Sequence, residues 1–288
     1  MLRAAVQRLR PMAKHNKLAS GLRVRHGSQV TLSDSSAANT FGWDKDSAKR
    51  RTARNLEALE ELQYHLYADS SKSLLVVLQG IDAGGKDGVI RKVFTAFNPQ
   101  GTSVTSFKAP SGREVSHDYL WRVHAACPSR GSIAVFNRSH YEDLIVPMVQ
   151  KKLSARRLKE RIQHIRDFEL MLNQEGTTIV KFLLHISRDE QWERLMSRLD
   201  EPHRNWKFSM SDLAERERWP LYISTFKKIV SETSVDHAPW YVIPANSKWF
   251  RDLAISEITR ITMERMSLKW PKPSVEVEPA RRALKKLR

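Results

Sequence analysis

The sequence has 288 residues, of which 41% are hydrophobic, so the chain can bury a large core in one α/β domain or in two small ones. Its single cysteine, Cys127, excludes an intrachain disulfide framework and favours a reducing, cytoplasmic location. The formal net charge of +17 predicts a polyanionic partner, while no apolar run approaches the ~18 residues of a membrane-spanning helix, so we expect no membrane partner.

The first 43 residues are predicted to form a basic, largely irregular arm, because they are rich in Ser, Asn and Gly and show little periodicity. No acidic residue precedes Asp34, a pattern that also occurs in organelle transit peptides. We favour an arm near a site that binds polyanions, and we keep the targeting segment as the alternative.

Strand and helix patterns alternate from residue 44 to about residue 268. The stretch S-L-L-V-V-L-Q at 73–79 is a continuous apolar strand of the kind that is buried on both faces of a parallel sheet. Further strands are predicted at 102–107, 132–137, 177–186 and 239–245. Helices are predicted at 44–68, 86–97, 113–126, 154–175, 189–199, 211–234 and 247–266. This alternation indicates an α/β, three-layer domain with a five-stranded parallel sheet flanked by helices, followed by a loose basic tail at 269–288.

A glycine-rich loop follows the first strand, and Gly80 to Lys86 matches G-x-x-x-x-G-K between a strand and a helix. Glycines let the backbone turn tightly and aim successive N–H groups inward, which makes an anion nest at a helix N-terminus. Lys86 can reach a terminal phosphate as a mobile charge. The predicted phosphate-binding residues of this loop are Gly80, Ala83, Gly84, Gly85, Lys86, Asp87 and Gly88.

Two aspartates set this loop apart from the usual form, in which Ser or Thr follows the lysine. Asp87 stands at that position, and it either belongs to the phosphate site or only stabilises the helix N-terminus. Asp82 lies inside the loop, where a carboxylate repels phosphate unless a cation lies between them. Asp82 therefore predicts a Mg²⁺ ion, with Mn²⁺ as a substitute.

Polar side chains follow the third strand, at the edge where open α/β sheets bind their ligands. Arg138 is placed to grip a phosphate bidentately. Asn137, Arg138, Glu142 and Asp143 are the predicted nucleotide-binding residues, and the predicted magnesium ligands are Asp82, Asn137, Glu142 and Asp143. The alternative is that Glu142 and Asp143 are only acidic residues in the first turn of a helix.

Cations further along the chain predict a mobile lid around residues 194–215. Arg194 and Arg198 share a helix face, and Arg204 and Lys207 follow in a loop. Together with Lys108, which follows the second strand, these four are predicted to bind phosphate, neutralise its charge and exclude water. A solvated basic face is the alternative.

Three residues after the second strand invite other interpretations. His117 and His124 are seven residues apart with no cysteine nearby, which is poor zinc spacing, so we interpret both as ordinary helix residues. We expect Trp121 in the core.

Seven stretches together resemble the second family of polyphosphate kinases: GIDAGGKDG, FKAPS, HDYLWRVH, RGSIAVFNRSHYEDLIV, HISRDEQWERL, WKFSMSD and APWYVIPANSKWF. The resemblance implies a P-loop kinase fold like that of thymidylate kinase, with a helical lid. It implies reversible, Mg²⁺-dependent transfer of a phosphoryl group between inorganic polyphosphate and AMP or ADP, with GMP and GDP as further candidates. It also implies a homodimer or homotetramer, with Asp82, Lys86 and Arg138 as catalytic residues.

Two other functions stay open. An ATP-dependent nucleoside or nucleoside-monophosphate kinase predicts Ser or Thr after the loop lysine, and Asp82 and Asp87 argue against it. A non-catalytic binder of RNA or another polyanion predicts exposed aromatics beside the basic clusters. The tryptophans lie mostly within helix and strand patterns instead, so we expect no nucleic-acid partner.

Overall fold

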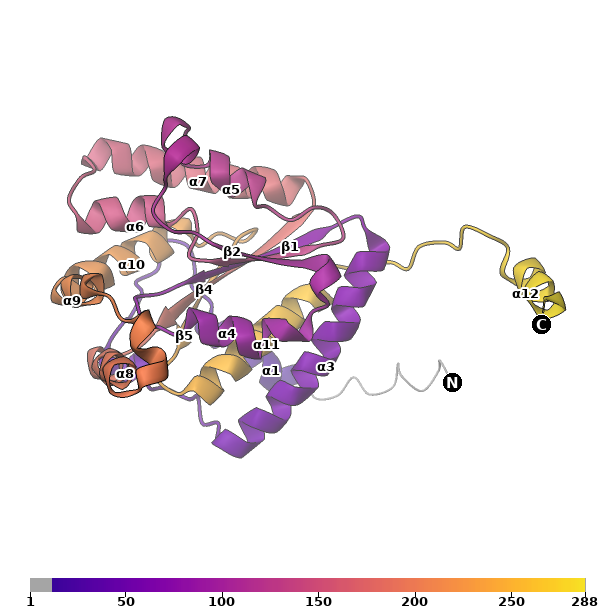
Figure 1. Cartoon of the computed structure of the whole chain (residues 1–288), viewed down its shortest axis with the longest axis horizontal. Coiled ribbons are helices and arrows are strands. Elements are labelled where there is room, and N and C mark those ends of the chain that lie inside the picture. The colour runs from indigo at the N-terminus through magenta and orange to yellow at the C-terminus, as the bar shows by residue number, and fades with distance from the viewer. Residues whose placement is uncertain (1–11, 288) are drawn as a thin grey trace.

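Five parallel strands form the centre of the computed structural model, which describes residues 12–287 (Figure 1). The strands are β1 (Ser73–Gln79), β2 (Thr102–Ser106), β3 (Ile133–Asn137), β4 (Thr177–His185) and β5 (Trp240–Pro244). Their order across the sheet is β2-β3-β1-β4-β5, and every neighbouring pair is parallel. The predicted five-stranded parallel sheet is therefore confirmed.

Helices cover both faces of this sheet, as Figure 1 shows with α3, α4 and α11 on one side and α5, α6, α7 and α10 on the other. The helices of the body are α3 (Lys45–Asp69), α4 (Lys86–Lys92), α5 (Trp121–Ala125), α6 (Glu142–Val149), α7 (Ala155–Gln174), α10 (Trp219–Thr233) and α11 (Lys248–Glu264). Short 3₁₀ turns are η1 (Phe94–Ala96), η2 (Pro99–Gly101) and η3 (Gly112–Ser116). Because both faces are covered, all seven residues of β1 are buried, which explains why that strand is continuously apolar.

The longest helix of the body begins and ends where local chemistry requires it. At its start, the Asp44 side chain accepts hydrogen bonds from the backbone N–H groups of Asp46 and Ser47, at 3.0 and 2.9 Å. It ends at Ser70, whose left-handed backbone (φ 52°) stops the helix. The predicted helix at 44–68 is confirmed.

Three predicted helices are each divided in the structure. The segment 86–97 forms α4 and η1. The segment 211–234 forms α9 (Met210–Glu217) and α10, because Pro220 starts a new helix and cannot continue the old one. The segment 113–126 forms only η3 and α5, because the Asp118 side chain accepts from the N–H groups of Leu120 and Trp121 and starts α5 late.

The described part of the N-terminal arm is ordered against the domain, whereas an irregular segment was expected. Helices α1 (Met12–Leu22) and α2 (Asp34–Ala37) form there, and Leu18, Leu22 and Leu32 are buried. A backbone bond from Val24 N to Trp240 O, 2.9 Å long, ties the arm to β5. These leucines pack into the core, so the domain extends N-terminal of residue 44; residues 1–11 lie outside the described part.

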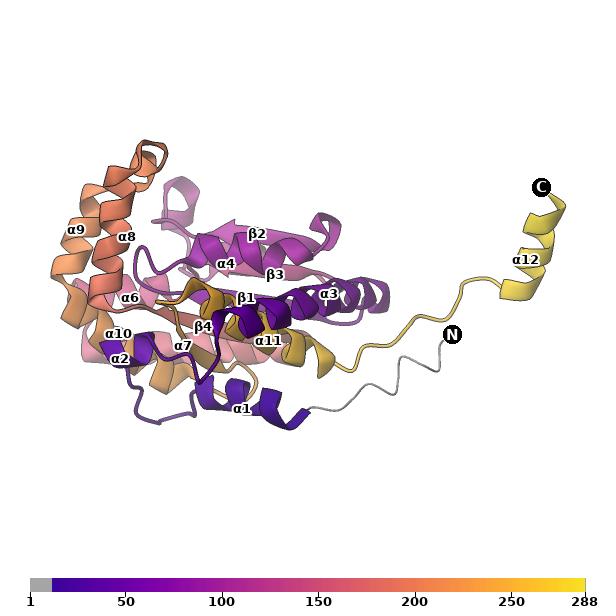
Figure 2. The same ribbon diagram turned by 90° about the horizontal axis from the view of Figure 1, so that it is seen from below.

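Two helical segments project from the body in Figure 2. The first consists of α8 (Arg188–Asp200), η4 (Pro202–Lys207) and α9, and it includes all residues of the predicted lid. The second is α12 (Val277–Lys286), which lies apart from the body and has no buried residue, where a loose tail was expected. Within the described range, no helix is both long and apolar enough to cross a membrane.

Candidate active site

The glycine-rich loop of residues 80–85 connects β1 to α4 at the carboxyl edge of the sheet. Gly80 passes so close to β4 that a Cβ atom there would lie 2.8 Å from the Leu184 carbonyl oxygen. Gly85 precedes α4 with φ 101°, a conformation that L side chains rarely adopt. The loop is therefore a tight turn that leads into the start of a helix, and the anion nest there stays a prediction.

Lys86 is the first residue of α4 and reaches back across this loop. Its Nζ donates to the carbonyl oxygens of Gly80 at 2.7 Å and Ile81 at 3.3 Å, and only 8% of the residue is exposed. Burial lowers the pKa of Lys86, although the charge of Asp82 opposes that effect. The amine thus lies inside the loop, beside Asp82.

Asp82 and Arg138 form the closest ion pair of the site. The Arg138 Nη2 lies 2.5 Å from the Asp82 Oδ1. Burial opposes ionisation of the Asp82 carboxyl, but the charges of Lys86 and Arg138 outweigh burial and lower its pKa to about 2. The three residues that the sequence predicts to be catalytic therefore lie together.

Glu142 and Asn137 join this group from the end of β3. The Glu142 carboxylate lies 3.9 Å from Arg138 Nη1, and with its amide correctly oriented Gln79 donates to Glu142 at 3.0 Å. Asn137 donates to the Asp87 carboxylate at 2.8 Å, so Asp87 contacts the strand edge as well as the helix start. Burial raises the pKa of Glu142.

Asp143 faces a different neighbourhood from Glu142. Its carboxylate lies 3.6 Å from Arg122 Nη2, and its carbonyl accepts from Arg161 at 2.6 Å. Burial raises the pKa of the Asp143 carboxyl. The predicted set of magnesium ligands is thus split between two places, and the residues from 12 to 287 contain no cluster of three or more His, Cys, Asp or Glu side chains arranged to hold a metal ion.

The cations of the predicted lid are distributed along it rather than gathered at the loop. Arg194 does reach the loop, because it donates to the carbonyl oxygens of Ala83 at 2.9 Å and Ala245 at 2.6 Å. Arg198 lies 3.2 Å from Asp212, which joins α8 to α9. Further out, Arg204 pairs with Glu201 at 2.7 Å, and the Lys207 ammonium lies over the Trp206 ring.

Three residues of the site escaped prediction because only the fold brings them to the loop. Glu215 of α9 shares a hydrogen bond with Asp82; burial, reinforced by the Asp82 charge and that bond, raises the pKa of Glu215 to about 8. Gln191 donates to the Asp82 carbonyl at 3.1 Å. Arg251, 3% exposed, donates to the Gly85 carbonyl at 3.3 Å. Arg251 could have been predicted from its place in the sequence, because it is a cation in the first turn of the helix that follows the last strand.

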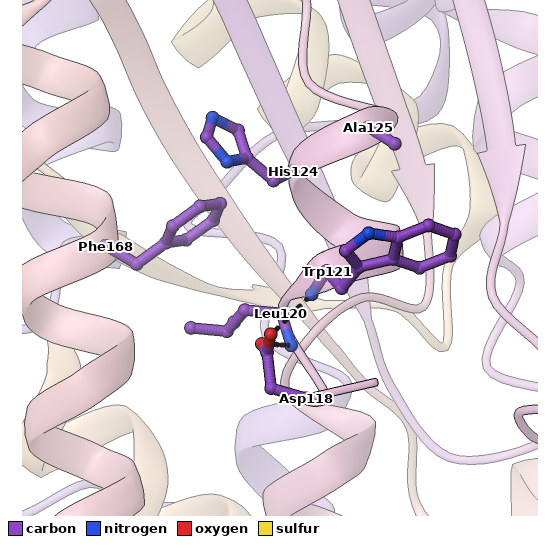
Figure 3. Close-up of a pocket in the computed structure, with 6 residues that line it drawn as sticks. All are labelled: Asp118, Leu120, Trp121, His124, Ala125 and Phe168. Atoms are coloured by element: carbon purple, nitrogen blue, oxygen red, sulfur yellow. Dashed lines mark hydrogen bonds between the residues drawn. The ribbon is translucent and has the colours of Figure 1, made fainter. Parts of the chain in front are cut away.

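The chain after β2 lines two pockets. One is a pocket of about 460 Å³ lined by residues of α5 and α7, in which the His124 ring lies 5.6 Å from the Phe168 ring and the Trp121 ring points away from Phe168 (Figure 3). Trp121 is exposed and stacks on His117 at 4.2 Å between ring centroids, so its predicted place in the core is wrong. The reason is that α5 has barely more than one turn, too short to bury the ring.

A second pocket of about 570 Å³ lies alongside and includes Glu114, Asp143 and Arg161. The carbonyl of Lys108 accepts from Arg122 at 2.8 Å near this pocket, while the Lys108 residue itself is exposed.

Comparisons with known proteins agree over most of the chain. The family model described as Polyphosphate kinase 2 matches residues 42–271. An AMP/ADP-polyphosphate phosphotransferase of Meiothermus ruber is 46% identical over 245 residues, which cover 85% of this chain and 92% of the relative. An ADP-polyphosphate phosphotransferase of Rhodopseudomonas palustris is 40% identical, with coverage of 90% and 93%.

Solved structures give the same result. The crystal structure of Polyphosphate Kinase 2 from Arthrobacter aurescens TC1 superposes with a TM-score of 0.89 at 39% identity, and the match covers 93% of this chain and 96% of that one. This likeness and the observed sheet confirm the predicted P-loop kinase type of fold.

Proposed function

The chain belongs to the polyphosphate kinase 2 family, and from that premise we propose that it transfers a phosphoryl group between inorganic polyphosphate and AMP or ADP. The observation that carries the proposal is the 46% identity with an AMP/ADP-polyphosphate phosphotransferase across 92% of that relative. The cluster of Asp82, Lys86 and Arg138 at the glycine-rich loop supports it, because cations at such a loop suit a chain of phosphates.

In the proposed reaction, an oxygen of the acceptor's terminal phosphate attacks the terminal phosphorus of polyphosphate. A new P–O bond forms, the adjoining anhydride P–O bond breaks, and the shortened polyphosphate leaves with the electron pair. A phosphate oxygen is already nucleophilic, so the protein mainly aligns the two phosphates and neutralises charge that develops between them. Lys86 and Arg138, which lie beside Asp82 at the loop, would supply the positive charge there.

Two carboxyl groups of the site fit the predicted Mg²⁺ ion. Asp82 and Glu215 offer oxygen donors only, and the hydrogen bond between their carboxyl groups raises the pKa of Glu215 and lowers that of Asp82. Mg²⁺ commonly takes one or two carboxylates and completes its shell with phosphate oxygens and water. Asp82 and Glu215 would hold the ion, which supplies charge neutralisation on the phosphates; Mn²⁺ is the expected substitute.

The remaining phosphate contacts follow the geometry of the loop and lid. The N–H groups of residues 80–88 would bind one phosphate chain, with Arg194 bracing the loop from the lid. Arg198, Arg204 and Lys207 would extend this track outward, and Lys108 would close over it from the other side. Asn137, Arg138, Glu142 and Asp143 stay the predicted nucleotide contacts. A homodimer or homotetramer and a cytoplasmic location belong to the same proposal.

One coupled assay tests this function. Purified protein is supplied with polyphosphate as the only phosphoryl donor, Mg²⁺, and AMP, ADP, GMP or GDP in separate reactions. We expect ADP and ATP from the adenine nucleotides, and the guanine arms measure base preference. Parallel reactions with ATP as donor and AMP as acceptor test the rival kinase. Product in those reactions, with none from polyphosphate, would overturn the proposal.

A further inference from the structure

A group of charged and polar side chains is completely buried directly behind the segment that carries Arg138 and Glu142. We call it the buried network, and it consists of Lys181 of β4, Glu169 of α7, and His140 and Tyr141 between β3 and α6. Each of the four is 0% exposed. The site described above uses none of them.

The contacts within the buried network are short and nearly complete. Lys181 Nζ donates to Glu169 Oε2 at 2.6 Å, to the Tyr141 hydroxyl at 2.8 Å and to the Thr233 carbonyl at 2.9 Å. Glu169 Oε1 accepts from the Tyr141 hydroxyl at 2.9 Å and lies 3.2 Å from His140 Nε2. Since an ionised carboxylate only accepts, Nε2 carries the proton of His140.

A stable core alone does not explain this arrangement. Removing two charges from water costs free energy that their attraction often fails to recover, and apolar side chains of similar size usually serve stability equally well. The surroundings of Lys181 are otherwise apolar and aromatic, with the Tyr141 and Trp240 rings both 5.2 Å from its ammonium. A role other than stability therefore has to be sought in what the network holds.

What it holds is a strained stretch of backbone. Arg138 has φ 61°, in the left-handed region that a long side chain rarely occupies. Such strain persists only where the surroundings fix the chain on both sides. On one side the Arg138 N–H donates to the Leu78 carbonyl at 3.0 Å; on the other, the next residues are Ser139, His140 and Tyr141, all 0% exposed.

We propose that the buried network is a positioning device, which locks His140 and Tyr141 to α7 and β4 and thereby fixes the guanidinium of Arg138 against Asp82. The inference rests on the proposed function only for what Arg138 does, not for how it is held. His140 and Tyr141 follow Arg138 by two and three residues, so a shift of either ring moves the Arg138 backbone. The same lock holds the start of α6, where Glu142 faces Arg138 at 3.9 Å.

The test replaces the ion pair by apolar side chains of similar size in a double variant, Glu169→Leu with Lys181→Met. This variant removes both charges together, so neither is left unpaired in the core. The change leaves the Tyr141 hydroxyl, the His140 Nε2–H and the Thr233 carbonyl without these partners, so we expect the variant to fold but to melt at a lower temperature than the unmodified protein. We expect kcat to fall by about 100-fold, the loss typical of a misplacement near 1 Å, while KM stays within about threefold. A folded double variant with unchanged kcat would overturn the inference.

A second comparison asks whether the loss acts through Arg138. Arg138→Ala is measured alone and in the double variant. If the network works by placing Arg138, the alanine change costs much less in the double variant than in the unmodified protein. If the two losses simply multiply, the network acts elsewhere and the inference is wrong.

Hydrogen exchange gives a readout that is independent of activity. We expect the amides of residues 138–142 to exchange faster in the double variant, while those of β1 exchange as before. This result would support the positioning role even if no polyphosphate reaction were found, so the two proposals can fail separately. Unchanged exchange at 138–142 would contradict the lock.

Two further variants keep the test decisive. Tyr141→Phe removes only the hydroxyl that bridges Lys181 and Glu169. If the double variant does not fold, we expect Tyr141→Phe to lower kcat, by less than 100-fold, and to speed exchange at residues 138–142. If Tyr141→Phe then changes neither kcat nor exchange, the inference is overturned. The control is Arg51→Met with Glu257→Leu, which removes the 2.9 Å pair between α3 and α11 together with the 2.8 Å contact of Glu257 to Arg260. We expect that control to leave kcat and the exchange of 138–142 unchanged.

Discussion

Replacing Glu215 with glutamine should make the free energy of unfolding less dependent on pH. In the folded protein burial, the charge of Asp82 and their hydrogen bond raise the pKa of Glu215 from its ordinary 4.5 to about 8. Between these values the folded state holds a proton that the unfolded state has released. Stability from this group is therefore fully present below pH 4.5 and is lost as the pH rises toward 8.

The size of the effect follows from those two values. A rise from 4.5 to about 8 corresponds to about 5 kcal/mol, at about 1.4 kcal/mol for each tenfold change in proton affinity. Solvent reaches part of the Glu215 residue, which screens the interaction, so we expect about 2–3 kcal/mol. Asp82, with a pKa of about 2, is ionised in both states over this range and adds nothing to the change.

Urea denaturation from pH 5 to pH 8.5, with EDTA to remove divalent metal, measures the effect. The unmodified protein should lose about 2–3 kcal/mol more than Glu215→Gln across that range, because every other titrating group is common to both. Parallel curves for the two proteins would refute the raised pKa of Glu215 beside Asp82.

Three further predictions concern the loop, the substrate and the core. Lys86→Ala and Arg138→Ala should each lower kcat by about 10²–10³-fold with an unchanged circular dichroism spectrum, since each removes a cation from the developing charge; near-normal rates would reject the roles assigned. Affinity for polyphosphate, measured by titration calorimetry, should fall steeply with added salt through counterion release. An affinity that does not change with salt would show that the net charge of +17 does not contribute to polyphosphate binding. Leu75→Ala, at a position with 0% exposure in the central strand, should cost about 2–5 kcal/mol of unfolding free energy in urea; a loss below about 1 kcal/mol would contradict the packing of β1.

The parts of the fold that the sequence predicts well depend on neighbouring residues. The five consecutive apolar residues of β1, Leu74 to Leu78, have to be covered on both faces of the sheet, and the structure places that strand at 73–79 as predicted. The glycine-rich loop is equally local, because its tight turn and helix start lie within seven residues. Asp82, Lys86 and Arg138 come together because parallel strands end at one edge of the sheet.

What the sequence does not predict depends on distant contacts. Glu215 looks like any acidic residue of a surface helix until α9 folds back over the loop. Lys181 interrupts an apolar strand without revealing its partner, which the structure finds in Glu169 twelve positions earlier on another element. Trp121 was expected in the core because its neighbours form a helical pattern, but α5 ends too soon to bury it.

The central claim is that Asp82, Lys86 and Arg138 act on a phosphoryl group that comes from polyphosphate. The most direct measurement follows single-turnover transfer of radiolabelled phosphate from polyphosphate to AMP, with Asp82→Asn beside the unmodified protein. We expect label in ADP with the unmodified protein and a loss of about 100-fold or more in Asp82→Asn. No labelled nucleotide from the unmodified protein, or equal rates from both, would contradict the claim.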